Sequence, residues 1–268
     1  MGKSLPNEIT QAIKKIAKQE KVALHEPWFF GNEKNYLEDC IKSNYVSSIG
    51  SYVEKFSKEL SKFTKSKYVV PVINGTSALH IALKLIDVKP NDEVIIPSLT
   101  FVATANAVIY SNALPNFVDI EEATLGICPL NLRKYLNKIG EKHQKGFINK
   151  KTGNIIKAII PMHTFGHPCN ILKILEIANE YNIKIIEDAA ESLGSYSKGI
   201  HTGTFGNIGV LSFNGNKIIT TGGGGAILTD NKNIANKANF LITTAKRKHK
   251  WEYIHEEVGY NYRMPNIN

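Results

Sequence analysis

The stretch Tyr68-Val-Val-Pro-Val-Ile-Asn-Gly-Thr-Ser-Ala-Leu-His-Ile-Ala-Leu83 joins a short apolar run to a helical pattern through a polar turn. The apolar run 68–73 is typical of a buried strand, and the spacing of the apolar residues that follow predicts a helix over 77–86. A strand that leads directly into a helix is the repeating unit of α/β proteins. This stretch therefore predicts a sheet that carries helices on its faces.

The same alternation extends along most of the chain. Other helices are expected over 8–18, 33–42, 51–63, 101–111, 129–139, 170–181 and 231–244. Other buried strands are expected over 93–96, 116–118, 155–160, 183–186, 209–213 and 226–228. Strands that alternate with helices favour an α/β fold with a mostly parallel mixed sheet of about seven strands and helices on both faces. The polar, aperiodic residues 140–153 are expected to form a surface loop.

Composition is that of an ordinary globular protein, with 43% hydrophobic and 21% charged residues. No apolar run is long enough for a membrane span, and residues 1–20 lack the apolar core of a signal peptide. Three scattered cysteines without CxxC spacing argue against a disulfide framework or a zinc site and fit a reducing, cytoplasmic location. The net charge of +9 is spread along the chain, which argues against a nucleic-acid partner.

Several functional candidates directly follow predicted strands, where ligands gather in parallel sheets. After Ile73, the segment Gly75, Thr76 and Ser77 combines a tight turn with residues that can cap a helix, which makes an anion site suited to phosphate. After the next strand, Phe101 could lie flat on a heteroaromatic ring. Taken singly, these features are more typical of an ordinary capped helix and of a core aromatic residue.

Two further candidates carry charge. Asp188 follows the strand 183–186, and a carboxylate at the end of a buried strand needs a cationic partner such as a protonated pyridine nitrogen; a helix N-cap is its alternative role. Lys217 lies between Ser212 and the glycine run 222–225, and its amine can form a Schiff base with an aldehyde cofactor; a solvated turn lysine is the alternative. A phosphate cradle, a stacking ring, a carboxylate and a lysine, in this order, match the requirements of pyridoxal 5′-phosphate (PLP).

The motifs resemble those of the DegT-type PLP-dependent nucleotide-sugar aminotransferases, within the fold-type I PLP enzymes. The resemblance covers residues 24–268 and rests on five segments: 74–79, 97–104, 187–190, 212–225 and 259–264. It implies a PLP-binding large domain over 51–268, preceded by an N-terminal helical segment over 1–50. Family members continue beyond the last motif into a small C-terminal domain, so the resemblance also implies that this chain is C-terminally truncated.

Carried over by position, the resemblance implies a role for each candidate. Lys217 would form the Schiff base and shuttle a proton between substrate and cofactor carbons, Asp188 would pair with the pyridine nitrogen, and Phe101 would stack on the ring. The cofactor phosphate would be held by Gly75, Thr76, Ser77 and Ser212. The asparagine matching Asn261 would reach the cofactor of the partner subunit, which implies a homodimer with shared active sites.

Two other residues, Glu191 and His163, are assigned to the cofactor pocket. Glu191 stands where many relatives have glutamine. The glycine run also differs, because this chain has Gly223 where most relatives have glutamate. His163 either lines the pocket or packs beside it; a metal site with His167 is not expected, because Pro161, Gly166 and Pro168 argue against a helix.

The expected reaction is a transamination in which L-glutamate supplies the amino group to a keto nucleotide sugar at C4. The segments 24–27, 31–33 and 46–50 resemble a narrower group that acts on 4-keto-6-deoxy sugars on the way to legionaminic-acid-like surface sugars. The basic cluster 246–250 is either a solvated loop or a site for the substrate's phosphates. Alternatives are a PLP-dependent sugar dehydratase, against which Lys217 counts, and a non-catalytic PLP-fold protein.

Overall fold

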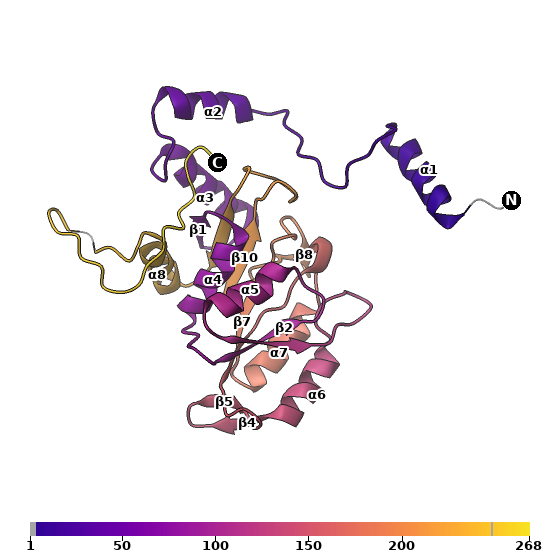
Figure 1. The fold of residues 1–268 in the computed structure, drawn as a ribbon, viewed down its shortest axis with the longest axis vertical. Coiled ribbons are helices and arrows are strands. Elements are labelled where there is room, and N and C mark those ends of the chain that lie inside the picture. Colours follow the sequence, from indigo (N-terminus) through magenta and orange to yellow (C-terminus); the bar gives the residue numbers. More distant parts are fainter. Residues whose placement is uncertain (1–3, 248) are drawn as a thin grey trace.

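The computed structural model describes residues 4–247 and 249–268, and the core is a seven-stranded sheet (Figure 1). The strands, in spatial order β1-β11-β10-β7-β6-β2-β3, are Tyr68–Val72, Gly225–Thr229, Ile208–Ser212, Lys184–Asp188, Ile156–Ile159, Glu93–Pro97 and Leu114–Val118. Strand β11 pairs antiparallel with both of its neighbours, and the remaining pairs are parallel. The predicted α/β fold with a mostly parallel seven-stranded sheet is confirmed.

Helices cover both faces of this sheet. Side chains of α4 (Gly75–Leu85), α5 (Val102–Tyr110) and α8 (Lys232–Ile242) pack with Val70, Val94 and their neighbours into one core cluster. On the other face, α6 (Pro129–Ile139) and α7 (Ile171–Glu180) pack on β2, β6 and β7, and α3 (Ser51–Thr64) packs on β1, β10 and β11. Alternate residues such as Val69 and Val70 contribute to opposite clusters, because successive side chains of a strand point to opposite faces.

The N-terminal helices lie outside this body. Helix α1 (Leu5–Ala17) has no buried residue, and α2 (Glu33–Lys42) buries Cys40 alone. Figure 1 shows both helices on an arm that extends from the sheet. The apolar stripe of α1 is therefore exposed, as are the aromatic residues Trp28, Phe29 and Phe30 that follow it.

The expected surface loop at 140–153 is a β-hairpin, which corrects the sequence prediction. Strands β4 (Gly140–His143) and β5 (Gly146–Asn149) pair antiparallel. Its anchor is the buried carboxylate of Glu93, which accepts hydrogen bonds from Asn149 Nδ2 at 2.9 Å and Thr152 Oγ1 at 2.6 Å. This polar network lies between residues far apart in the chain, so hydrophobic periodicity gives no sign of it.

Two short strands, β8 (Tyr196–Ser197) and β9 (Ile200–His201), form a second small hairpin, and one turn of 3-10 helix spans Thr164–Gly166. Neither was predicted, because such short elements have no measurable periodicity. In the part of the chain that the structure describes, no helix has the length and apolar character needed to cross a bilayer.

Candidate active site

Helix α4 begins where β1 ends, and its first turn forms one wall of a pocket. Asn74 is the N-cap residue, and its Oδ1 accepts a hydrogen bond from the Ser77 N–H at 2.8 Å. Gly75 begins the helix in close contact with β10: a Cβ placed on Gly75 would lie 2.9 Å from Ser212 Cβ. Glycine is thus required here by the close approach of two backbone segments.

These contacts correct three details of the prediction. The helix begins at Gly75 and not at Ser77, and Asn74 rather than Thr76 or Ser77 caps it. The Ser77 N–H, expected to hold a phosphate, is used by Asn74 instead. Thr76 and Ser212 do line the pocket, as does the backbone at Gly75.

Asp188 is the last residue of β7 and is almost fully buried. Its Oδ2 accepts a hydrogen bond from Thr104 Oγ1 at 2.7 Å, and its Oδ1 accepts one from the Ala190 N–H at 3.2 Å. Burial raises the pKa of Asp188, while these hydrogen bonds and the nearby charge of Lys217 oppose the increase. No helix follows β7, so the alternative of Asp188 as an N-cap is wrong. A cationic ring nitrogen would stabilise the ionised form of this carboxylate.

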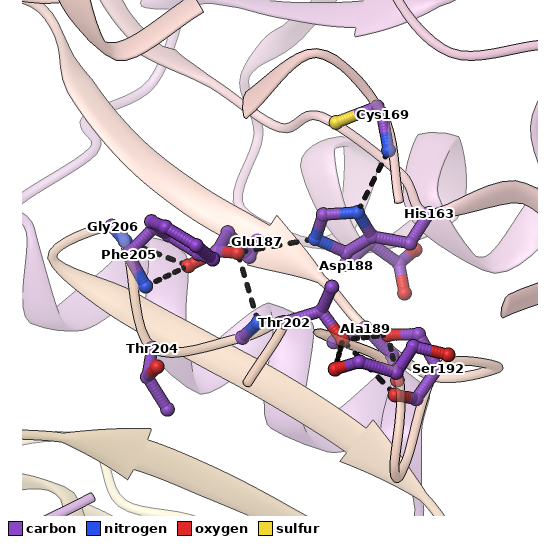
Figure 2. Close-up of polar contacts among 12 residues, drawn as sticks. His163, Cys169, Glu187, Asp188, Ala189, Ser192, Thr202, Thr204, Phe205 and Gly206 are labelled. Carbon is purple, nitrogen blue, oxygen red and sulfur yellow. Dashed lines mark hydrogen bonds and ion pairs between the residues drawn. The ribbon is translucent and has the colours of Figure 1, made fainter. Parts of the chain in front are cut away.

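Behind Asp188 lies a buried polar cluster, which Figure 2 shows. Glu187 accepts hydrogen bonds from the backbone N–H groups of Gly203, Phe205 and Gly206, at 2.6–2.8 Å. The imidazole Nε2 of His163 lies 3.1 Å from Glu187 Oε2, and the Cys169 N–H donates to Nδ1. The Cys169 N–H requires an unprotonated Nδ1, so the proton on Nε2 is directed at Glu187.

The position of His163 resolves the two roles that the sequence left open. Its side chain is fully buried, and it does not line the pocket. Its backbone N–H donates to the Asp188 carbonyl oxygen at 3.1 Å. His163 thus packs beside the site, and its assignment to the pocket lining is corrected. Glu187, which supports this buried cluster, was not predicted as a functional residue. The sequence alone does not show that its carboxylate faces away from the pocket and contacts His163.

Lys217 projects into the pocket from the turn after β10. Its Nζ lies 3.1 Å from Glu191 Oε1 and 5.6 Å from the centre of the Phe101 ring. Phe101 precedes α5 and is more than half exposed, with its ring beside the pocket. The amine, the aromatic ring and the Glu191 carboxylate therefore meet at one place.

One cavity of about 360 Å³ brings most of the predicted residues together. Its lining includes Gly75, Thr76, Phe101, Asp188, Glu191, Ser212 and Lys217. Ser77 and His163 lie behind this lining, and Asn261 is exposed elsewhere on the surface, beside Thr243. Among lining residues that were not predicted are Met162, Asn214 and Asn216; the two asparagines precede Lys217 closely enough in sequence to have been suspected.

These residues fit PLP. The α4 N-terminus, Thr76 and Ser212 offer N–H and O–H donors around the space that Gly75 leaves open, which suits a phosphate. Asp188 and Lys217 suit the ring nitrogen and the aldehyde of the cofactor. Among residues 4–247 and 249–268, no group of three or more His, Cys, Asp or Glu residues is arranged to hold a metal ion.

A second, larger cavity of about 1250 Å³ is strongly basic. Its charged lining consists of Lys246, Arg247, Lys250 and Arg263, with His249 beside them. Lys248, the remaining residue of the predicted basic cluster, lies outside the described residues. Arg263 Nε is buried, and within the described residues it has no hydrogen-bond partner. This cavity is suited to an anion.

Comparison with known proteins places this architecture. The model of the DegT/DnrJ/EryC1/StrS aminotransferase family matches residues 30–268. The chain is 38% identical, over 92% of its length, to the putative pyridoxal phosphate-dependent aminotransferase EpsN of Bacillus subtilis (strain 168). It is 39% identical, over 92% of its length, to GDP-perosamine synthase of Escherichia coli O157:H7. The chain spans 61% and 63% of the lengths of these two curated relatives.

A solved structure agrees with this placement. The aminotransferase from Psychrobacter cryohalolentis superposes with a TM-score of 0.78 at 31% identity, over 91% of this chain and 61% of that one. The fold and the arrangement of the pocket define the class: this is the large-domain architecture of fold-type I PLP enzymes. The chain belongs to the DegT/DnrJ/EryC1/StrS aminotransferase family.

Proposed function

We propose that this chain carries the active site of a PLP-dependent aminotransferase that transfers an amino group from L-glutamate to C4 of a 4-keto-6-deoxy nucleotide sugar, for the synthesis of surface polysaccharides or nonulosonates. The observation that carries the proposal is the meeting of Lys217, Asp188, Phe101 and Ser212 in one pocket. The name of one relative, GDP-perosamine synthase, supports a nucleotide-sugar substrate, and the name of the other, putative pyridoxal phosphate-dependent aminotransferase, supports the reaction type and the cofactor.

When bound, PLP supplies an aldehyde for amine exchange and a ring that withdraws electrons from the reacting carbon. Lys217 holds and moves the proton at Nζ, since its amine reaches the pocket from a turn that Asn214 fixes through the Lys217 N–H. Asp188 places its carboxylate at the base of the pocket, where Thr104 keeps it in position. Phe101 closes one side of the pocket and excludes water from the amine.

The basic cavity is proposed to receive the diphosphate of the sugar nucleotide. Lys246, Lys250 and Arg263 concentrate positive charge there, and charge-assisted contacts to phosphate are among the strongest polar contacts. Replacing Lys246 and Lys250 by alanine should raise KM for the nucleotide sugar about tenfold and leave the reaction with glutamate unchanged. An equal loss in both half-reactions would exclude this role.

The first experiment is the visible absorption spectrum of the protein with PLP, before and after L-glutamate, beside the Lys217→Ala variant. We expect an absorption band that depends on Lys217 and that glutamate bleaches. Incubation with a 4-keto nucleotide sugar should then give an amino sugar, identified by mass spectrometry. A band that forms without Lys217, or a deoxygenated sugar product without nitrogen, would contradict the proposal.

A further inference from the structure

The carboxylate of Glu191 lies between two hydrogen-bond donors at the edge of the pocket. Its Oε1 is 3.1 Å from Lys217 Nζ, and its Oε2 accepts the Phe165 N–H at 3.0 Å. Both side chains of the ion pair are largely buried, with 10% of Lys217 and 23% of Glu191 exposed. An ion pair this sheltered is screened less by solvent than a surface pair.

The backbone around Glu191 is built to hold this arrangement. Phe165 has a φ of 53°, in the left-handed region that a bulky residue rarely adopts, and this conformation accompanies its N–H contact with Glu191. Gly166 follows with a φ of 81°, and a Cβ on it would lie 2.5 Å from the Glu191 carbonyl oxygen. Ser195 Oγ donates to the Gly166 carbonyl at 2.6 Å and joins the two loops.

A carboxylate at this position satisfies both donors. A carboxylate presents an acceptor oxygen on each side, so it satisfies the Phe165 N–H and an ammonium group at once. Glutamine has one acceptor oxygen and an NH₂ donor, so one of its two sides would set donor against donor. The site is therefore matched to a lysine in its ammonium form.

We propose that Glu191 is a positioning residue that holds protonated Lys217 whenever the lysine amine is not covalently engaged. This inference rests on the proposed function, in which Lys217 is released and carries a proton during each turnover. By accepting a hydrogen bond from the ammonium, Glu191 keeps the amine directed into the pocket, and the amine must leave this ion pair before it can attach to an aldehyde.

The other charged groups near this pair leave the role to Glu191. Asp188 also lies in the pocket and accepts hydrogen bonds from Thr104 and the Ala190 N–H, but its carboxylate is not within ion-pair distance of Lys217 Nζ. Glu187 and His163 pair with each other behind β7. His201 accepts a hydrogen bond from the Gly194 N–H through Nε2. Of the carboxylates in the described residues, Glu191 is the one within ion-pair distance of Lys217 Nζ.

The test measures how fast the Lys217-dependent absorption band forms on mixing with PLP. In Glu191→Gln the amine has no ion pair to leave, so the band should form about tenfold faster than in wild type. Glu191→Asp, which keeps the carboxylate, should restore part of the wild-type rate. Glu59→Gln, which removes the exposed Lys62–Glu59 pair, is the matched control and should behave as wild type.

Binding of pyridoxamine 5′-phosphate, which has no aldehyde, separates positioning from pocket shape. Glu191 also lines the pocket, so the dissociation constant of this ligand in Glu191→Gln measures what Glu191 contributes to cofactor binding itself, and the change in the rate of band formation should exceed the change in this affinity. An unchanged rate of band formation in Glu191→Gln, or a loss of pyridoxamine phosphate binding that accounts for its altered rate, would overturn the inference. Absence of the band in wild type would instead overturn the proposed function, and this inference with it.

Discussion

At the scale of single residues, the site depends on where side chains are missing as well as where they are present. Gly75 has ordinary helical geometry, so its role is to let the start of α4 approach Ser212 on β10. This approach sets the width of the pocket end that we assign to the cofactor phosphate. A methyl group added at position 75 would therefore affect cofactor binding, because the nearest atoms belong to Ser212 on strand β10 and cannot move freely.

We predict that Gly75→Ala weakens PLP binding at least about tenfold, since a Cβ 2.9 Å from Ser212 Cβ forces the two segments apart. Gly223→Ala is the control, because the nearest atom to a Cβ there is Ile73 O at 3.9 Å. Fluorescence titration with PLP measures both affinities. Equal affinities for the two variants would show that the close contact at Gly75 does not shape the cofactor site.

His80 is a second residue whose surroundings give a prediction. It is buried among the rings of Tyr110, Tyr260 and Tyr262, and within the described residues neither ring nitrogen has a hydrogen-bond partner. Burial, with a smaller effect from Lys84, lowers the pKa of His80 from 6.5 to about 4. Below pH 6.5 the unfolded chain therefore takes up a proton that the folded chain does not.

Stability should accordingly fall as pH decreases from 6.5 to about 4. We expect His80 to account for a loss of about 2 kcal/mol between about pH 7 and pH 5. Urea unfolding at both pH values, for wild type and His80→Phe, measures this contribution. The variant should lose that much less stability than wild type; the same pH dependence in both would place the titration elsewhere.

At the scale of elements, the N-terminus of α3 is capped from the other end of the chain. Asn266 Oδ1 accepts the N–H groups of Tyr52 and Val53 at 3.0 and 3.3 Å, and its Nδ2 donates to the Tyr45 carbonyl at 2.7 Å. Gly50 makes room for it, since a Cβ there would lie 2.2 Å from Asn266 Cγ. A single buried amide thus ties the segment before α3 to the last residues of the chain.

Removal of this cap should cost more than removal of a local one. Asn266→Ala leaves several buried groups without partners, so we expect a loss of about 3 kcal/mol in the free energy of unfolding. Asn231→Ala, which removes the exposed N-cap of α8, should cost about 1 kcal/mol. Urea unfolding of the two variants provides the comparison. A smaller loss for Asn266→Ala would mean that water readily replaces the amide.

At the scale of the whole molecule, we expect the proposed active site to extend over two subunits. Asn261 is exposed on its own chain, and α5 and the residue before it carry exposed apolar side chains, among them Phe101 beside the pocket, Val102 and Tyr110. An exposed apolar surface of this kind is typical of an interface. We expect a second copy of the chain to cover it and to bring its Asn261 to the first pocket.

Mixing inactive variants tests this arrangement. Lys217→Ala lacks the amine in its own pocket, and Asn261→Ala would lack the contact that it supplies to its partner. In a mixed dimer, the pocket with Lys217 receives an intact Asn261, so PLP binding that neither variant shows with wild-type affinity should return in one site of two. If mixing leaves affinity as poor as in Asn261→Ala alone, Asn261 acts within its own chain or not at all.

The sequence by itself determined the alternation of strands and helices, because the period of apolar residues fixes which face of each element is buried. It also placed Gly75, Phe101, Asp188 and Lys217 directly after strands, so their convergence could be expected from the parallel sheet alone. Family membership was evident from the motifs around these residues.

The tertiary structure decided what depends on contacts between distant segments. It showed that Asn74 occupies the Ser77 N–H, that His163 packs behind the pocket, and that Glu93 anchors a hairpin where a loop was expected. It also paired Glu191 with Lys217, across 26 positions of sequence. Hydrogen bonds of this kind leave no periodic pattern in the chain, since each requires only that two polar groups meet once the fold has formed.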